Sequence, residues 1–200
     1  MGSTRITIGL VALAAFAAGL AISLNLRQPA QVTEATVFAA PRPLPETSLR
    51  DHSNAALDRD SFRNRWDILF FGFTHCPDIC PTTLFELRQL SNSLNDLAVA
   101  RQPRIWLISI DPQRDTPEVL NAYISNFGDS YHAATGSEEQ IAQFAGGLGV
   151  AYQRIPEGDD YTMAHTTALF LVNPDAELVA LFSAPHDMTR IAADYRELTR

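Results

Sequence analysis

ILFFGFTHCPDICPTTLFELRQLSNSLNDL, residues 68–97, holds the most informative pattern in this chain. Its first part, residues 68–73, is a short, continuous apolar run, which is typical of a strand buried on both faces of a sheet. Leucines then recur every three or four residues and predict an amphipathic helix over residues 81–97. Because proline is tolerated at the first position of a helix, Pro81 predicts that this helix begins just after Cys80. A buried strand followed by a cysteine loop and a helix indicates an α/β domain.

The rest of the domain alternates strands and helices in the same way. Residues 105–110 form a second apolar run, and two apolar runs near the C-terminus, residues 167–172 and 177–182, are joined by the turn sequence NPDA as a hairpin. Helix-start signals precede two further helices: Thr116 with Pro117, and the capping box Ser137–Gln140. A last helix is predicted over residues 188–198. This order predicts an α/β fold of the thioredoxin-like type, a mixed sheet flanked by helices.

An uncharged apolar segment occupies residues 6–26, between Arg5 and Arg27. Its length suits a helix that crosses a bilayer core of roughly 30 Å. A cleaved signal peptide is the alternative, but its apolar region usually spans only ~7–15 residues. We therefore predict a short tail over residues 1–5, a transmembrane signal-anchor over 6–26, a Pro/Ala-rich linker over 27–43 and the folded domain over 44–200, with residues 44–49 as an edge strand.

Length and composition are those of one globular domain with an added segment. The chain has 200 residues, 46% of them hydrophobic, with a net charge of −8. This acidic balance argues against a nucleic-acid partner and predicts no electrostatic attraction to an anionic lipid surface. All 15 basic residues are arginine, which excludes Schiff-base lysine chemistry and a P-loop lysine. With only two cysteines, a disulfide-stapled miniature and a four-cysteine zinc ribbon are excluded as well.

Both cysteines, Cys76 and Cys80, lie between the first buried strand and its helix, where open sheets collect functional sites. The positive end of the helix dipole favours thiolate over thiol, and thiolates attack disulfides or bind soft metals such as Cu(I). Redox enzymes of this fold normally hold a C-x-x-C motif, whereas here three residues intervene. The longer loop permits either a disulfide or convergence of both sulfurs on one ion, so the cysteines alone leave both uses open.

His165 is the candidate for a third ligand. It precedes the strand predicted over residues 167–172, in a loop that faces the cysteine loop in thioredoxin-like folds and usually carries a cis-proline there. No proline occurs between Pro156 and Pro174, so this position offers an imidazole instead. Two sulfurs and one imidazole predict a three-ligand copper site, and an ordinary hydrogen-bonded loop histidine is the alternative.

Four stretches together resemble the SCO/SenC family of membrane-anchored copper proteins: THCPDICP (74–81), DPQRDTPE (111–118), GSEEQI (136–141) and the His165 loop. The likeness runs from about Pro41 to Arg200. It implies a thioredoxin-like fold and a role in handing copper to the binuclear copper centre of cytochrome c oxidase subunit II, or in reducing the cysteines of that centre. Carried over by position, the family's copper ligands fall on Cys76, Cys80 and His165.

The resemblance has one departure near the site. Ala164 stands where the family usually has an aspartate before its ligand histidine, and losing such a carboxylate can cost ~10–100-fold in metal affinity or activity. Three residues are expected to support the site. His75 should point away from the neighbouring cysteine. Asp78 either tunes the site, contacts the partner or forms a turn, and Asp111 either braces the cysteine loop or belongs to a turn. The remaining histidines are expected in solvated loops: His52, His132 and His186.

These observations favour a copper chaperone rather than an enzyme, anchored in a bacterial inner membrane with its domain in the periplasm. A mitochondrial inner membrane is the second choice, because residues 1–5 are too short for a presequence. The chaperone would hold Cu(I), with Cu(II) needing further ligands such as water. Its expected partner is cytochrome c oxidase subunit II or another exported copper protein. The alternatives are a thiol–disulfide oxidoreductase, in which Cys76 attacks and Cys80 resolves as a disulfide, and a peroxide sensor.

Overall fold

A computed structural model describes residues 16, 19 and 32–200 of the chain. Residues 32–200 form one compact unit. The predicted tail, the membrane anchor and the first part of the predicted linker fall outside the described residues, apart from Phe16 and Gly19. Among the described residues, no helix is both long enough and apolar enough to cross a membrane.

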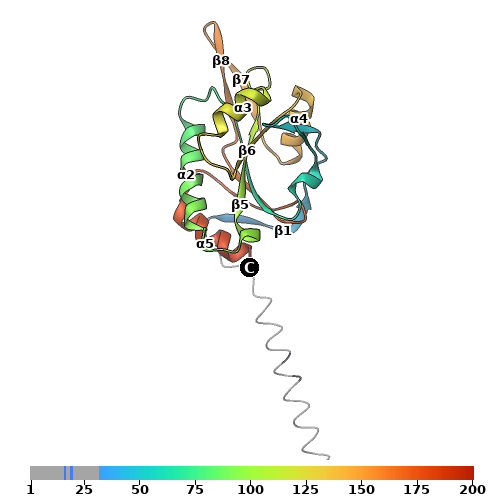
Figure 1. Cartoon of the computed structure of the whole chain (residues 1–200), viewed down its shortest axis with the longest axis vertical. Helices are drawn as coiled ribbons and strands as arrows, with labels where there is room; N and C mark the ends of the chain where they lie inside the picture. The colour runs from blue at the N-terminus through green and yellow to red at the C-terminus, as the bar shows by residue number, and fades with distance from the viewer. Residues whose placement is uncertain (1–15, 17–18, 20–31) are drawn as a thin grey trace, which may run out of the picture. The chain divides into compact units, whose positions relative to one another are not determined.

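The unit is built on an eight-stranded mixed sheet (Figure 1). Its centre is parallel, as buried apolar strands in an α/β fold should be, and antiparallel strands extend it on both sides. The strands occur in the spatial order β1 (Ala35–Pro43), β10 (Glu177–Phe182), β9 (Leu169–Val172), β4 (Trp66–Gly72), β5 (Pro103–Ser109), β6 (Tyr131–Thr135), β2 (Leu49–Asp51) and β3 (Ala56–Leu57). The predicted mixed sheet and the C-terminal hairpin are confirmed.

Helices cover both faces of the sheet because the central strands are apolar on both faces. Alternate residues of β4 enter different cores: Ile68 and Phe70 lie in one, Leu69 and Phe71 in the other. The first core is closed by α2 (Ile79–Ser93), α3 (Pro117–Ile124) and α5 (Met188–Leu198), and the second by the 3-10 helix η1 (Arg59–Phe62) and α4 (Glu138–Gly147).

The predicted helix caps are present. The Thr116 side chain accepts a hydrogen bond from Val119, with Pro117 at the first helical position, and Ser137 and Gln140 form the reciprocal capping box of α4. The start of α2 differs from the prediction, because the helix begins at Ile79 rather than after Cys80. Pro81 is accommodated because the first-turn N–H groups of a helix have no partner within the helix.

The predicted linker over residues 27–43 is wrong for its second half. Residues 35–43 form β1, an edge strand paired antiparallel with β10. The buried Asp194 carboxylate of α5 accepts hydrogen bonds from the backbone N–H groups of Thr33, Glu34 and Ala35 at 2.7–3.0 Å. The Ala- and Pro-rich composition hid this strand, since its side chains are mostly exposed and show no apolar alternation. The edge strand expected over residues 44–49 is reduced to β2, which starts at Leu49.

A two-stranded ribbon outside the main sheet was not foreseen. It consists of β7 (Tyr152–Glu157) and β8 (Asp160–His165), and Gly158, at φ +61°, lies in its turn. Both strands are largely exposed, so their residues lack the apolar pattern that marks a buried strand. The ribbon projects from the end of the domain that carries the amino end of α2 (Figure 1), and its last residue is His165.

The structure places His132 in β6 and not in a solvated loop, where the sequence predicts it. Its burial predicts that the folded domain loses stability in acid. Its ring stacks on Trp106 with centroids 4.8 Å apart. Burial, with a smaller contribution from the neighbouring His52, lowers the pKa of His132 to about 4. The unfolded chain therefore takes up a proton below pH ~6.5 that the folded chain resists until pH ~4. We expect this residue to remove on the order of 1–2 kcal/mol of folding free energy between these pH values, after allowance for its partial exposure.

The test compares urea unfolding of the wild type and His132→Gln across that pH range. Asp67, whose pKa burial raises to about 6, titrates over the same range with the opposite effect on stability. The difference between the two proteins isolates His132: it should shrink as the pH falls from 7 to 4. A difference that stays constant with pH would contradict the prediction.

Candidate metal centre

Cys76 and Cys80 lie where the carboxyl end of β4 turns into α2. Cys76 is half-buried in the loop, and Cys80 is buried in the first turn of the helix. Both thiols are free. The Cys80 backbone N–H, one of the unpaired donors at the helix start, points at the Cys76 sulfur over 3.3 Å. The loop and the start of α2 thus direct a backbone hydrogen-bond donor at the Cys76 sulfur and place Cys80 in the adjoining first turn of the helix.

His165 approaches the cysteines from the end of β8, on the other side of the site. Its Nε2 lies 4.0 Å from the Cys80 sulfur, and its ring meets Phe73 edge-on with centroids 6.2 Å apart. Its Nδ1 is 2.9 Å from the Thr166 carbonyl oxygen, which can only accept. Nδ1 therefore carries the proton, and the Nε2 lone pair faces the sulfur. In metal-binding histidines, the ring nitrogen that does not bind the metal usually donates its proton to a carbonyl or carboxylate in this way, which fixes the tautomer.

Two of the three predicted ligands line one small pocket, and the third lies against one of them. Cys76 and His165 line it directly, together with the apolar side chains of Phe73 and Met163, and Cys80 lies below, against His165. Within residues 32–200, no three His, Cys, Asp or Glu side chains are already closed around a single point as metal ligands. The donor set fits a soft ion, since two thiolates and one imidazole suit Cu(I), but the ligands would have to draw together around it.

The expectation that both thiols are favoured as thiolates fails for Cys80. Burial raises the pKa of the Cys80 thiol well above its ordinary value, and the nearby Cys76 adds to this. The reason is the helix start: Cys80 is inside the first turn with its side chain in the core, where loss of solvent outweighs the helix dipole.

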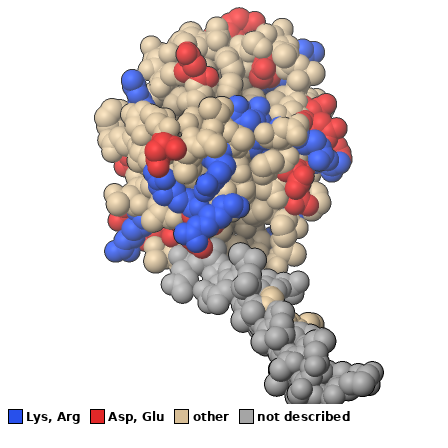
Figure 2. All heavy atoms as spheres, turned by 60° about the horizontal axis from the view of Figure 1, so that its bottom comes forward, with Lys and Arg blue, Asp and Glu red and all other residues tan. Residues whose placement is uncertain are grey.

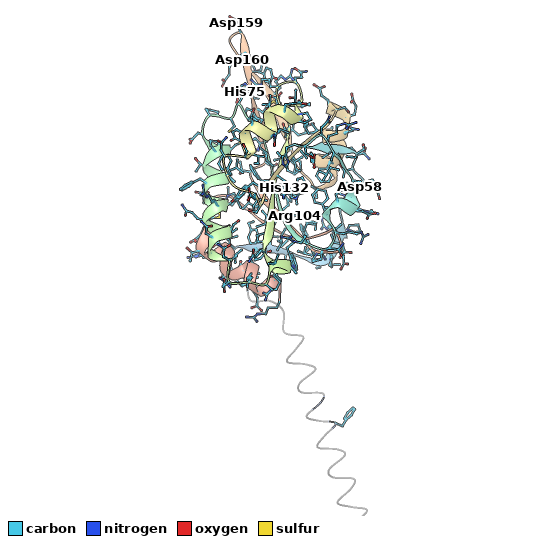
Figure 3. All side chains as sticks on the ribbon, viewed as in Figure 1. Asp58, His75, Arg104, His132, Asp159 and Asp160 are labelled. Atoms are coloured by element: carbon cyan, nitrogen blue, oxygen red, sulfur yellow. The ribbon has the colours of Figure 1, made fainter. Side chains whose placement is uncertain are left out.

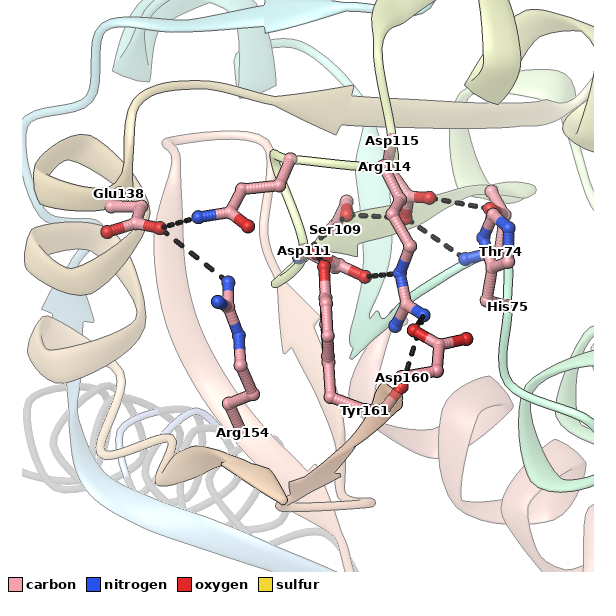
Figure 4. Close-up of polar contacts among 11 residues, drawn as sticks. Thr74, His75, Ser109, Asp111, Arg114, Asp115, Glu138, Arg154, Asp160 and Tyr161 are labelled. Carbon is pink, nitrogen blue, oxygen red and sulfur yellow. Dashed lines mark hydrogen bonds and ion pairs between the residues drawn. The ribbon is translucent and has the colours of Figure 1, made fainter. Parts of the chain in front are cut away.

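Asp115 is the residue that anchors the cysteine loop, and the sequence reading missed it. Its buried carboxylate accepts the Thr74 backbone N–H at 3.0 Å and the Thr74 hydroxyl at 2.5 Å, and it also accepts the Ser109 hydroxyl at 2.6 Å (Figure 4). Thr74 stands two residues before Cys76. The available signal was the position of Asp115 just after the second buried strand, at the edge of the sheet where the cysteine loop begins.

Asp111 supports the other half of the site. It forms an ion pair with Arg114 at 2.5 Å and accepts the Tyr161 hydroxyl at 2.8 Å. The Arg114 guanidinium stacks on the Tyr161 ring at 3.8 Å and donates to Asp160 and to the Tyr161 carbonyl (Figure 4). These contacts hold β8, the strand that ends in His165. Asp111 therefore braces the histidine ribbon, and Asp115 braces the cysteine loop.

The other predicted supporting residues lie at the rim. His75 is exposed, with its ring nitrogen 3.1 Å from the Thr74 hydroxyl, and it lies toward the end of the domain that carries β8 (Figure 3). It is not among the residues that line the pocket. Asp78 precedes α2 without capping it and lines the pocket. Ala164 lines the pocket beside His165, so no carboxylate stands at the position before the histidine.

Gly72, at the end of β4, leaves the space that Cys80 occupies. A Cβ at this position would lie 2.8 Å from the Cys80 sulfur and 3.1 Å from a Leu107 methyl. We expect Gly72→Ala to destabilise the fold by about 1–3 kcal/mol and to weaken copper binding, because the sulfur must move. Gly146→Ala in α4, where a Cβ meets nothing within 4 Å, is the matched control and should leave both unchanged or slightly raise stability. Urea unfolding measures the stability, and Cu(I) competition titration measures the copper affinity. A Gly72→Ala protein that is destabilised but binds copper with unchanged affinity would contradict the predicted effect on binding.

The fold and this pocket define a thioredoxin-like protein whose dithiol loop is faced by an imidazole. The comparisons with known proteins agree: a family model described as SCO1/SenC matches residues 43–200. The chain belongs to the SCO1/SenC family.

Its relatives extend from bacteria to mitochondria. A Stutzerimonas stutzeri protein provisionally named as copper-binding is 37% identical over 166 residues, which are 82% of this chain and 81% of that protein. The human mitochondrial SCO1 homologue is 32% identical over 148 residues, 73% of this chain but only 49% of its own length. The chain thus spans about half of the human relative.

Solved structures of relatives carry copper. The copper-bound ScoI of Arabidopsis thaliana superposes with a TM-score of 0.71 at 30% identity, covering 80% of this chain and 96% of that one. The copper-bound ScoI of Bradyrhizobium japonicum superposes with a TM-score of 0.68 at 32% identity, covering 78% and 98%. The expected family, thioredoxin-like fold and copper-binding character are therefore confirmed at the level of the family.

Proposed function

We propose that this chain is a copper chaperone that binds one Cu(I) as cargo through Cys76, Cys80 and His165. The observation that carries the proposal is the tautomer of His165: its Nε2 lone pair is directed at the Cys80 sulfur beside the pocket that Cys76 lines. Both thiols give up their protons on binding, and the 4.0 Å gap closes as the ligands move onto the ion. The Cys80 backbone N–H points at the Cys76 sulfur, so this sulfur keeps a hydrogen-bond donor when it binds the ion.

The acceptor we propose is the binuclear copper centre of cytochrome c oxidase subunit II, or another exported copper protein. A three-ligand pocket open on one side suits transfer, because an incoming cysteine or histidine can take a place on the ion before a ligand of this chain leaves. No substrate is turned over, so the activity is delivery rather than catalysis. We place the chain in a bacterial inner membrane, anchored through residues 6–26 with its domain in the periplasm, in preference to a mitochondrial inner membrane.

The direct test is a transfer assay with the full-length reduced chain in detergent. Loading should give one Cu(I) per chain. When the loaded chain is mixed with the reduced, copper-free domain of subunit II and the two proteins are separated once, the copper should be found on the subunit II domain. Absence of bound copper in the reduced chain would overturn the proposal. Binding without transfer would remove subunit II as the acceptor and leave another exported copper protein.

A second candidate is thiol–disulfide reduction, favoured by the donor that points at Cys76. The Cys76 thiolate would attack an acceptor disulfide and release one acceptor thiol; the Cys80 sulfur would then displace the second, leaving a Cys76–Cys80 disulfide and a dithiol acceptor. This route needs no imidazole ligand. His165→Ala therefore separates the two: it should abolish copper transfer while leaving reduction of an oxidised acceptor largely intact.

A further inference from the structure

A second cavity lies beyond the carboxyl ends of β5 and β6, at the same end of the parallel strands as the cysteine loop. Its volume is about 490 Å³, within the range of small-molecule sites. The loop after β5 lines it through Asp115 and Thr116, the turn after β6 through Gly136 and Ser137, and the segment before β2 and the edge strand β3 line it as well. None of the three proposed copper ligands lines it, but Asp115 is shared, because its carboxylate also anchors the cysteine loop.

Two of the four stretches that resemble the SCO/SenC family meet at this cavity. The stretch DPQRDTPE contributes Asp115 and Thr116 to its wall, and the stretch GSEEQI contributes Gly136 and Ser137. Within the fold, GSEEQI begins α4. The copper site proposed above uses none of its residues, so a second site at this cavity would give the stretch a role that copper binding does not.

Two threonine hydroxyls at the cavity have no hydrogen-bond partner among residues 32–200. Thr135, at the end of β6, is only 6% exposed, and its Oγ1 is buried without a partner. The Oγ1 of Thr47 is buried and unpaired in the same way. Both residues line the cavity. A buried hydroxyl without a partner costs folding free energy, so these two groups point to a hydrogen-bonding partner from outside the chain.

Arg50 supplies positive charge at the cavity. It is exposed on β2 and lines the cavity, and its guanidinium donates to the Asn54 carbonyl at 3.1 Å. No carboxylate of the described residues lies within 4.0 Å of it. At the end of the domain that carries α5, by contrast, acidic side chains lie among the arginines (Figure 2), and Arg196 pairs with Asp96 at 2.6 Å. Arg50 is therefore available to an anionic ligand.

The other charges at the cavity favour an anion of single charge. The amino ends of α3 and α4 meet the cavity at Thr116 and Ser137, and the positive end of a helix dipole attracts negative charge. Two carboxylates also line it, and both already have donors: Asp115 has the three described above, and Asp58 accepts the N–H and the hydroxyl of Ser61 at 2.9 and 2.8 Å. Their negative charge opposes a doubly charged ligand such as phosphate more strongly than a carboxylate.

We propose that this cavity binds a small monocarboxylate with an apolar body. The carboxylate bonds to the Arg50 guanidinium, which presents a fork of N–H donors, and to the unpaired Thr135 hydroxyl. The apolar body packs against Leu49, Leu57 and Pro117, which give the cavity apolar walls. The proposal does not depend on copper binding, since the two sites have no ligand-binding residue in common.

The test titrates the full reduced chain, in detergent and without copper, with benzoate, which has one carboxylate and one ring. We expect saturable changes in the amide NMR resonances of residues 49–51, 56–58 and 135–137, with a dissociation constant of about 1–10 mM, an ordinary affinity for so small a ligand. Benzamide keeps the shape without the charge, and inorganic phosphate keeps negative charge without the ring. Each should bind about tenfold more weakly or worse, because one of the two kinds of contact is missing.

Variants assign the binding to the named side chains. Arg50→Gln should weaken benzoate binding about tenfold or more, because a charge-assisted pair is lost. Thr135→Val keeps the shape of the side chain and should weaken binding roughly threefold or more, while urea unfolding of the ligand-free chain shows equal or greater stability, because an unpaired buried hydroxyl is removed. The matched control is Arg88→Gln, an exposed arginine on α2 that does not line the cavity and should leave benzoate binding unchanged.

Four outcomes count against the proposal. Resonance changes that do not saturate, or that lie away from the cavity, overturn the site. Benzamide that binds as tightly as benzoate overturns the assignment of a carboxylate. Undiminished binding of benzoate to Arg50→Gln removes the arginine from the site. A loss of stability in Thr135→Val shows that the hydroxyl already serves the fold and is not reserved for a ligand.

Discussion

Replacing His165 with alanine is expected to reduce the Cu(I) affinity of the reduced chain by more than ~100-fold. That exceeds the ~10–100-fold cost of losing an outer partner, because a direct ligand is removed. The structure supports this size of effect: the Nε2 lone pair faces the Cys80 sulfur at 4.0 Å, and Nδ1 is held by the Thr166 carbonyl. Competition titration against a Cu(I) chelator of known affinity measures it, with circular dichroism to confirm that the variant is folded.

The control for this prediction is His75→Ala. His75 is the histidine adjacent to Cys76 in sequence, but it is exposed and bonds to Thr74 outside the pocket. Its replacement should change copper affinity by less than a factor of about three, since only an exposed contact is lost. If His75→Ala were the damaging change and His165→Ala harmless, the ligand assignment would have to be reversed.

Asp115→Asn is expected to weaken copper binding about 10–100-fold and to lower stability by roughly 1–3 kcal/mol. The carboxylate accepts three hydrogen bonds while fully buried, and an amide in its place cannot accept them all. Two of these bonds hold Thr74, so the loop that carries Cys76 loses its anchor. Urea unfolding of the apo chain and Cu(I) competition titration give the two numbers separately.

A double-mutant cycle distinguishes loop anchoring from a general loss of stability. Thr74→Val removes the hydroxyl contact to Asp115 and should lower copper affinity in the same direction. If Asp115 acts through Thr74, the double variant should be much less affected than the sum of the single variants. Additive losses, or a fall in stability with unchanged copper affinity, would mean that Asp115 serves the core and not the cysteine loop.

The sequence correctly predicted the features that depend on residues close together in the chain. The run at residues 68–73 became β4, the capping signals at Thr116 and Ser137 began α3 and α4, and α5 covers residues 188–198 as expected. These features depend on side-chain alternation and on donors within one turn. Both are properties of neighbouring residues.

The errors lie where the partner is distant in the chain. Residues 35–43 look like a linker, yet they form β1 because β10 offers an open edge and Asp194 offers acceptors some 160 positions away. The β7–β8 ribbon was missed because both strands are exposed and carry no periodic signal. Its consequence is functional, since this ribbon delivers His165.

The residues themselves supply the chemistry: two thiols with three residues between them, one histidine where a proline is usual, and a family likeness that assigns them copper. How these groups are held depends on the fold. Packing buries Cys80 in the first turn of α2 and so raises the pKa of its thiol, and folding sets Asp115 under the cysteine loop and Asp111 under the histidine ribbon. Desolvation and hydrogen-bond partnership depend on which segments meet in space, whereas residue identity and local propensity are already present in the chain.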